Sequence, residues 1–272
     1  MSGVLILRLV LGGAIGYAAI CSLLWLFQER LAFPAPRAAL PDPGSLGLDG
    51  ERINLRLADG TQLAGWYLPP RDRATSFPGL LWFYGNRENI ATIWPVIRDV
   101  RPRAAALLVV DYPGYGASGG RSSEARVYAA GTAAWDALAA RPGIDPNRIY
   151  VYGRSVGTSV ATHVAASHPA AGLILESPFT SARAMARRHY GIFPSGLVRL
   201  RLDNLATIAR VACPVLVLHG TVDRLVPTAM GRQVAAAAPG PVELVLIEGA
   251  GHNDTYTLGG AQYQRKLAEF VR

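Results

Sequence analysis

IYVYGRSVGTSVATHVAAS, residues 149–167, is the stretch that decides the fold class. Ile149–Tyr152 is a short apolar run that suits a buried strand, and Val156–Ser167 is compatible with a helix. Between them, Gly153 and Gly157 relieve crowding at a tight turn, where Ser155 would be held in a strained backbone conformation. This context predicts a strand–turn–helix unit that raises the Ser155 hydroxyl above the end of a sheet. The alternative is an ordinary Gly-rich turn with a capping serine.

The chain beyond residue 51 repeats this alternation of strand and helix. Arg52–Leu57 and Gln62–Leu68 alternate about an Asp-Gly pair, which predicts an antiparallel hairpin. Ser122–Ala140 and Thr228–Ala238 are Ala-rich and compatible with helices. The short apolar runs predicted as strands are Gly79–Tyr84, Ala105–Val110, Gly172–Leu175, Pro214–Leu218 and Val242–Ile247. We therefore predict an α/β fold with a mostly parallel central sheet and helices on both faces.

Composition limits the classes of partner. Half of the 272 residues are hydrophobic, which is enough for a sizeable core. The net charge of +8 comes from 27 basic residues, of which only Lys266 is a lysine, and the arginines are scattered rather than clustered. We therefore expect no nucleic-acid partner. Cys21 and Cys213 have no metal-ligand spacing, and no metal or organic cofactor is expected.

The N-terminal segment differs from the rest of the chain. Leu9–Phe27 is a run of 19 residues without a formal charge, and Trp25 lies near its end as an aromatic anchor would. At about 1.5 Å per residue the run is just long enough to cross a hydrocarbon core of about 30 Å. The prediction is a retained membrane anchor, with a cleaved signal peptide or a buried core helix as alternatives.

The expected organisation has three parts. Residues 1–30 form the transmembrane anchor, residues 31–50 form a Pro-rich connector that cannot be helical, and residues 51–272 form the main domain. A short insertion at about 179–210 is expected to lie over the strand ends and to roof the site in part. Arg8 and Arg30 bracket the span almost evenly, so the sequence does not decide which side of the membrane the domain faces.

Three residues that each follow a predicted strand suit nucleophilic catalysis. A serine hydroxyl needs a base, and His252, in a Gly-containing loop after the last strand, is the best candidate. Asp223 would orient the imidazole, and the order Ser155, Asp223, His252 matches α/β-hydrolases. His219 is the rival base and Glu176 the backup carboxylate, both at strand ends.

An oxyanion hole requires two backbone donors near the serine. Val156 would supply one from the start of its helix, and Asn86, in the loop after the strand at 79–84, would supply the other. The side chains of Asn86 and Asn89 also suit a turn with side-chain-to-backbone hydrogen bonds. The residues expected to contact substrate are Tyr84, Gly85, Arg154 and Phe179.

Several stretches together resemble a known family. FYGNREN, DYPGYGASGG, YGRSVG, LESPFTS, HGTVDRLVP and GAGHND occur in the order found in Bem46-like and ABHD13/ABHD17-like membrane-anchored α/β-hydrolases, often grouped with the serine aminopeptidase S33-type domain. The resemblance implies a triad of Ser155, Asp223 and His252 and an oxyanion hole from Asn86 and Val156. Family members commonly have His where this chain has Tyr84, which we expect to alter a pocket wall and leave the backbone donors in place.

The sequence thus predicts a serine hydrolase that cleaves an acyl ester or thioester, since a partly apolar insertion beside a membrane favours lipid-like acyl chains. One alternative is a peptidase or amidase on the same triad, for which Glu176 is the obvious amine-binding carboxylate. The other is a catalytically silent, membrane-tethered binding protein. Dehalogenase chemistry is not expected, because Ser155 stands where an aspartate would be required.

Overall fold

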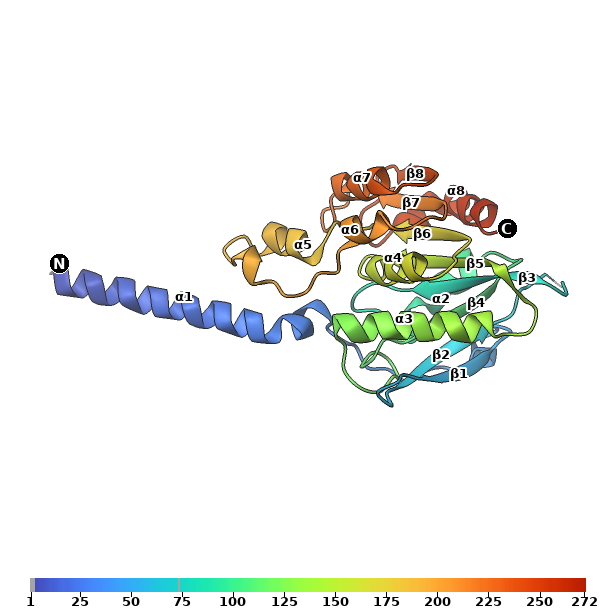
Figure 1. Ribbon diagram of the computed structural model, residues 1–272, viewed down its shortest axis with the longest axis horizontal. Coiled ribbons are helices and arrows are strands. Elements are labelled where there is room, and N and C mark those ends of the chain that lie inside the picture. The colour runs from blue at the N-terminus through green and yellow to red at the C-terminus, as the bar shows by residue number, and fades with distance from the viewer. Residues whose placement is uncertain (1–2, 73) are drawn as a thin grey trace.

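The computed structural model describes residues 3–72 and 74–272, and within them eight strands form one sheet (Figure 1). The strands, in the order in which they lie in the sheet, are β1 (Glu51–Arg56), β2 (Gln62–Leu68), β4 (Ala106–Val110), β3 (Phe77–Phe83), β5 (Ile144–Arg154), β6 (Gly172–Glu176), β7 (Val215–Gly220) and β8 (Val242–Ile247). Strands β1, β2 and β4 pair antiparallel, and the remaining pairs are parallel. The predicted class, a mostly parallel sheet entered by a hairpin, is confirmed.

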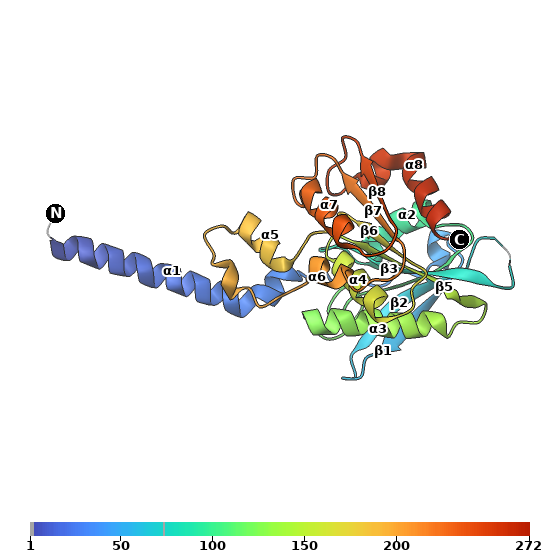
Figure 2. The ribbon, with the colours of Figure 1, turned by 45° about the horizontal axis from the view of Figure 1, so that its top comes forward.

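Helices cover both faces of the sheet (Figures 1 and 2). On one face α3 (Glu124–Ala139) packs against α4 (Gly157–Ser167), and α6 (Asn204–Ile208) lies between α4 and α7 (Thr228–Ala237). On the other face α2 (Ile90–Val100) packs against α8 (Thr255–Phe270). Because both faces are covered, β4, β6 and β7 are buried along their whole length, which explains their uninterrupted apolar sequences.

Two structured segments were not predicted from the sequence pattern, and one local prediction was wrong. Helix α2 carries Pro95 in its interior, and it begins at a capping box in which Asn89 accepts from the Thr92 backbone N–H at 3.1 Å. Helix α8 contains Gly260 in a non-helical conformation, which interrupts its periodicity. The connector at 31–50 is not wholly non-helical, because η1 (Gly44–Leu46) forms a single 3₁₀ turn between Pro43 and Gly47.

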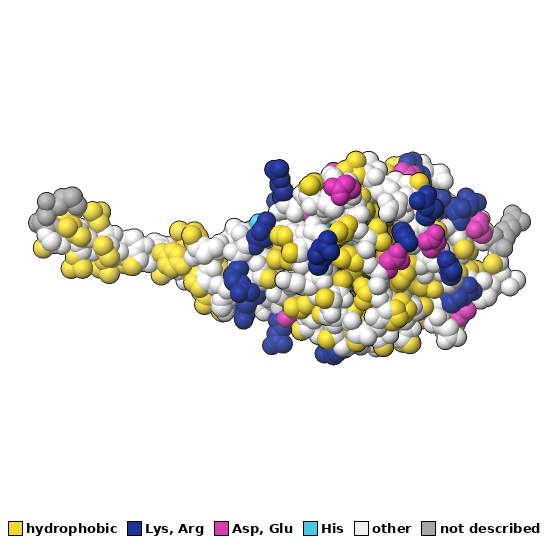
Figure 3. Space-filling model, turned by 90° about the horizontal axis from the view of Figure 1, so that it is seen from above, with side chains coloured by type: hydrophobic (Ala, Val, Ile, Leu, Met, Phe, Trp, Pro, Cys, Tyr) yellow, Lys and Arg dark blue, Asp and Glu magenta, His cyan; other side chains and the backbone are white. Residues whose placement is uncertain are grey.

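The N-terminal helix α1 (Gly3–Ala32) projects from the domain (Figure 1). Of its described residues only Cys21 and Gln28 are buried, and it is the one helix in the described chain that is long and apolar enough to cross a membrane. Figure 3 shows hydrophobic side chains along it and basic side chains where it meets the domain.

The segment between β6 and β7 packs beside the C-terminal half of α1. It contains α5 (Ala182–His189), η2 (Ser195–Leu197) and α6. The Gln28 side-chain oxygen accepts from the backbone N–H groups of Arg199, at 2.7 Å, and Leu200, at 3.3 Å. The Arg199 guanidinium also lies over the Trp25 ring, 4.3 Å from its centroid. The predicted insertion is therefore docked on α1 as well as on the domain.

The packing at the β5–α4 turn generates a stability prediction. A Cβ added at Gly157 would lie 2.2 Å from the Phe83 carbonyl oxygen, whereas one at Gly196 would meet nothing within 4 Å. We expect Gly157→Ala to lower the free energy of unfolding by about 1–3 kcal/mol, the range for forced overpacking, and Gly196→Ala to change it by less than about 0.5 kcal/mol. Denaturant unfolding in detergent measures both, and equal effects would contradict the packing argument.

Candidate active site

Ser155 lies on a strained turn at the carboxyl end of β5. Its φ of 51° is in the left-handed region, which few residues other than glycine adopt. The turn is fixed from both sides, because the Ser155 N–H donates to the Glu176 carbonyl at 2.9 Å and its own carbonyl accepts from the Thr158 hydroxyl at 2.5 Å. The strand, strained turn and helix follow the predicted pattern, and the serine side chain is directed into a cavity.

Three side chains from distant parts of the chain form one hydrogen-bonded series. The Ser155 hydroxyl lies 3.0 Å from His252 Nε2, and His252 Nδ1 lies 2.7 Å from Asp223 Oδ2. The loops after β5, β7 and β8 supply these residues, since parallel strands end at the same edge of the sheet. This geometry allows His252 to accept the serine proton while Asp223 holds the imidazole.

The Asp223 carboxylate is held by several donors. Its Oδ1 accepts from the backbone N–H groups of Leu225, at 2.9 Å, and Val226, at 2.8 Å. Burial alone would raise the pKa of this carboxyl, but hydrogen bonds with His219 and His252 outweigh burial and place the pKa well below its ordinary value. The carboxylate is therefore ionised at neutral pH, as an orienting group must be.

His219, the rival base, is not in contact with Ser155. Its Nε2 lies 2.9 Å from the Val226 carbonyl oxygen and 3.5 Å from Asp223 Oδ2, and its side chain is fully buried. His219 therefore lies near the same carboxylate oxygen of Asp223 as His252, and it supports the carboxylate rather than the nucleophile.

A cavity of about 460 Å³ opens over Ser155. Its walls come from α1, from the 179–202 part of the insertion and from the loop after β7. The lining residues are Leu24, Gln28, Leu31, Ala32, Asn86, Ser155, Val156, Phe179, Ala182, Met185, Ala186, His189, Tyr190, Phe193, Val198, Leu200, Leu202, Leu225 and Val226. Of the residues predicted to contact substrate, Phe179 lies in this wall. The contribution of α1 was missed by sequence reasoning, although Gln28, the first polar residue after the apolar run, was a signal that the helix end is not simply embedded in lipid.

Asn86 and Val156 both line the cavity beside Ser155. Within residues 3–72 and 74–272, neither of their backbone N–H groups donates to a protein acceptor, so both are free to bind an oxygen. The Asn86 side chain is fully used: Nδ2 donates to the Ala32 carbonyl at 2.9 Å, and Oδ1 accepts from the Tyr115 hydroxyl at 2.9 Å. The Asn86 side chain is thus hydrogen-bonded to the backbone, as expected, and the carbonyl that accepts its hydrogen bond belongs to Ala32, the last residue of α1.

Arg154 does not line the cavity as expected, because its side chain leaves the strand on the other side of the turn. Its guanidinium pairs with Glu88, lies 3.3 Å from Glu176 and donates to the His252 carbonyl at 2.9 Å. Burial alone would lower its pKa, but Glu176 and Glu88 raise the pKa above its ordinary value. Arg154 therefore ties together the loops that carry Ser155, His252 and Asn86.

Tyr84 and Gly85 also differ from expectation, since neither lines the cavity over Ser155. Tyr84 is fully buried beneath the loop; its hydroxyl donates to Asp111 at 3.0 Å and accepts from the Tyr112 N–H at 3.1 Å. The Gly85 N–H is bound by Glu88 at 2.6 Å. The tyrosine is therefore a support for the Asn86 loop and not a wall of the cavity over Ser155.

Glu176 is likewise committed to a structural network. Its carboxylate accepts from the hydroxyls of Tyr152, Thr255 and Tyr263, the last at 2.7 Å, in addition to the Arg154 contact. It does not reach His252, and it does not line the cavity over Ser155. The backup role and the amine-binding role considered for Glu176 thus find no geometric support.

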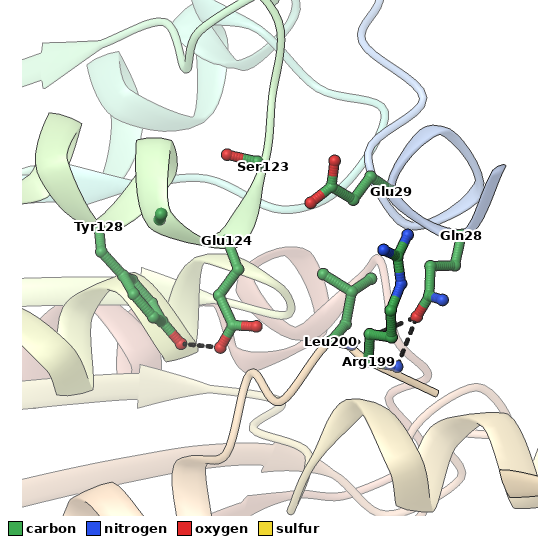
Figure 4. A pocket seen from close by; sticks show the side chains of 8 residues that line it. Gln28, Glu29, Ser123, Glu124, Tyr128, Arg199 and Leu200 are labelled. Atoms are coloured by element: carbon green, nitrogen blue, oxygen red, sulfur yellow. Dashed lines mark hydrogen bonds between the residues drawn. The ribbon is translucent and has the colours of Figure 1, made fainter. Parts of the chain in front are cut away.

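A separate cavity of about 410 Å³ lies between α1, α3 and the insertion (Figure 4). In it Glu124 accepts from the backbone N–H groups of Arg201, at 2.8 Å, and Leu202, at 2.9 Å. Figure 4 shows Gln28 bonded to Arg199 and Leu200 on its other side. These contacts fasten the strap 199–202 between α1 and α3, so that Leu200 and Leu202 face the Ser155 cavity.

Comparison with known proteins agrees with this architecture. Residues 124–272 match the sequence profile of the prolyl oligopeptidase family. The uncharacterized protein Rv2307c of Mycobacterium tuberculosis is 34% identical over 98% of this chain and 93% of its own length. The human alpha/beta hydrolase domain-containing protein 17B is 39% identical over 71% of this chain and 65% of its own length.

Solved structures share the fold at low sequence identity. The esterase Pf2001 of Pyrococcus furiosus superposes with a TM-score of 0.70 at 19% identity, covering 87% of this chain and 98% of that one. Est1E of Butyrivibrio proteoclasticus superposes with a TM-score of 0.65 at 19% identity, covering 80% of this chain and 96% of that one. The resemblance to ABHD17-like hydrolases is confirmed, and the chain belongs to the prolyl oligopeptidase family of α/β-hydrolases.

Proposed function

We propose that this hydrolase is membrane-anchored and cleaves acyl esters or thioesters through an acyl-enzyme on Ser155. The observation that carries the proposal is the series Asp223–His252–Ser155, with contacts of 2.7 Å and 3.0 Å, opening into an apolar cavity. The strained backbone at Ser155 supports it further, because such strain concentrates at functional turns.

In the first step His252 Nε2 takes the Ser155 proton as the oxygen attacks the substrate carbonyl carbon. The carbonyl oxygen becomes an oxyanion, which the free N–H groups of Asn86 and Val156 bind. As the tetrahedral centre collapses, the bond to the leaving group breaks. His252 then gives its proton to the leaving alcohol or thiol, and the acyl group remains on Ser155.

In the second step water replaces the leaving group. His252 removes a proton from that water as it attacks the acyl-enzyme, and the same two N–H groups bind the second oxyanion. Collapse releases a carboxylic acid, and the proton on His252 returns to Ser155. Asp223 remains ionised throughout and stabilises the charged imidazole.

The cavity lining supports an acyl chain as the group that is bound. Apolar side chains from α1 and from the insertion, which includes α5, form most of the lining. None of the described lining residues carries a carboxylate. Recognition of a peptide amino terminus requires such a charge, and Glu176 is engaged elsewhere. The lining therefore favours an ester or thioester over the peptidase alternative.

Helix α1 supports the membrane anchor. Its 30 residues extend for about 45 Å, and its apolar side chains are exposed outside the domain. A core helix of a water-soluble domain buries an apolar face, whereas here only Cys21 and Gln28 are buried. A bilayer would cover this exposed apolar surface.

Labelling with a fluorophosphonate probe tests the nucleophile. We expect the wild type to react and Ser155→Ala not to react at all. Asp223→Asn is expected to react about 10⁴-fold more slowly, as loss of the orienting carboxylate disfavours the correct imidazole tautomer. Failure of a demonstrably folded wild type to react would instead favour a catalytically silent, membrane-tethered binding protein.

The depressed pKa of Asp223 predicts a pH-dependent contribution to stability. A carboxyl whose folded pKa is lowered stabilises the protein above its unfolded pKa, about 3.9 for aspartate, and loses that contribution as pH falls toward the folded value. Wild type and Asp223→Asn should therefore differ more in free energy of unfolding at pH 7 than at pH 3. Denaturant titration of both proteins measures the difference, and a gap independent of pH would contradict this account.

Graded p-nitrophenyl esters test the acyl pocket. We expect kcat/KM to rise from acetyl to longer chains, and Ala186→Phe, which fills the cavity, to lower it for long chains while sparing acetyl. Ala184→Phe, on the same helix but outside the lining, is the matched control. Activity that falls steadily from acetyl upward would contradict the acyl-chain proposal, and preferred cleavage of an aminoacyl anilide would favour a peptidase.

A further inference from the structure

The loop between α5 and the strap is uncharged and has basic residues on both flanks, none of which takes part in the proposed reaction. Tyr190–Val198 contains no charged side chain, and it is flanked by Arg187-Arg188 on one side and Arg199 on the other. From Phe179 to Leu202 the chain has five arginines and no aspartate or glutamate. An uncharged loop with basic flanks is the composition of a segment that enters an anionic lipid surface.

The loop exposes large apolar side chains to the exterior of the protein. Ile192 is 81% exposed, Tyr190 54% and Leu197 40%. The segment that follows α5 lies at the same end of the molecule as α1 and runs beside that helix (Figures 1 and 2). The exposed apolar surface of the loop is thus continuous with that of the proposed anchor.

One hydrogen bond fixes the depth of the loop along α1. The Tyr17 hydroxyl donates to the Ile192 carbonyl at 2.6 Å. Only eight uncharged residues separate Arg8 from Tyr17, which is about 12 Å of helix and too short to cross a hydrocarbon core of about 30 Å. A bilayer around the apolar run must therefore extend past Tyr17 and include the loop at Ile192.

The other face of the same loop lines the cavity over Ser155 through Tyr190, Phe193 and Val198. Four lining residues are also exposed and so form the cavity mouth: Leu31 at 53%, Tyr190 at 54%, Leu225 at 46%, and His189. This mouth is largely apolar, and it is bordered by α1, the end of α5, the loop and the segment after β7. A chain entering there would come from lipid and not from water.

We propose that the loop Tyr190–Val198 is a second membrane contact, with Ile192 and Leu197 among the lipid chains and the flanking arginines against anionic headgroups, so that the cavity over Ser155 opens directly to the leaflet. The proposal rests on the proposed membrane anchor and names the route by which its substrate arrives. Figure 3 shows basic side chains gathered around the base of α1, where headgroups would lie.

Site-specific fluorescence tests the contact. In a Cys21→Ala/Cys213→Ala background, an environment-sensitive fluorophore is attached to Ile192→Cys, and the protein is reconstituted in phosphatidylcholine/phosphatidylglycerol vesicles that contain nitroxide-labelled acyl chains. We expect loss of fluorescence comparable to that of a label at Val10→Cys in α1. A label at Asn147→Cys, exposed at the opposite end of the sheet, should keep its fluorescence.

The control labels separate the two proposals. If the label at Val10 loses fluorescence and the label at Ile192 does not, the second contact is overturned and the anchor is not. That result would favour a protein partner on the loop. If the label at Val10 keeps its fluorescence, both the anchor and the second contact are overturned. Denaturant unfolding reports that each variant is folded, whether or not Ser155 is reactive.

Activity provides an independent readout. Ile192 and Leu197 do not line the cavity, so Ile192→Asp/Leu197→Asp should leave hydrolysis of a water-soluble butyrate ester unchanged. On a long-chain ester embedded in vesicles we expect at least about tenfold slower turnover, because the partition effect of one buried aliphatic side chain is already about that large and the variant removes two. Val242→Asp, at the start of β8 and the opposite end of the sheet, should affect neither substrate. An equal loss on both substrates would indicate a structural defect and overturn the proposal.

Discussion

The turn from β5 to α4 leaves no room for a side chain at Gly153 or Gly157, and the rest of the site depends on that close packing. A Cβ at Gly153 would lie 2.4 Å from the Gly157 carbonyl oxygen, and one at Gly157 would approach the Phe83 carbonyl oxygen still more closely. Helix α4 can therefore begin in direct contact with the backbone of β3 and β5. That contact brings Ser155 within reach of the loops that follow β7 and β8 and beside the loop that carries Asn86.

Arg154, the neighbour of Ser155, stabilises this arrangement from the side away from the cavity. A guanidinium presents several donors in a fixed plane, so one side chain can satisfy Glu88, Glu176 and the His252 carbonyl at once. A lysine would supply a single ammonium and could not hold all three loops in the same geometry. The buried tyrosine hydroxyls around Glu176 complete the network and keep that carboxylate in place.

The sequence predicted the parts of this molecule that are governed by local pattern. Apolar runs located the central strands to within a few residues, and the glycine spacing around Ser155 predicted its strained turn. The pattern did not reveal α2 or α8, whose periodicity is interrupted by Pro95 and Gly260. The side chains of Tyr84 and Arg154 could not be placed either, because the loop beneath one and the carboxylates around the other come from distant parts of the chain. The wall that α1 gives to the cavity depends on tertiary packing that no periodicity encodes.

The positive φ of Ser155 places function and stability in opposition at a single residue. A non-glycine residue in the left-handed region costs about 1–2 kcal/mol, and this cost is present in the resting protein. Glycine would suit this backbone better and would remove the hydroxyl that the chemistry needs. Selection for stability alone would therefore move the chain toward an inert protein of the same fold, and the serine at this position records selection for something other than folding.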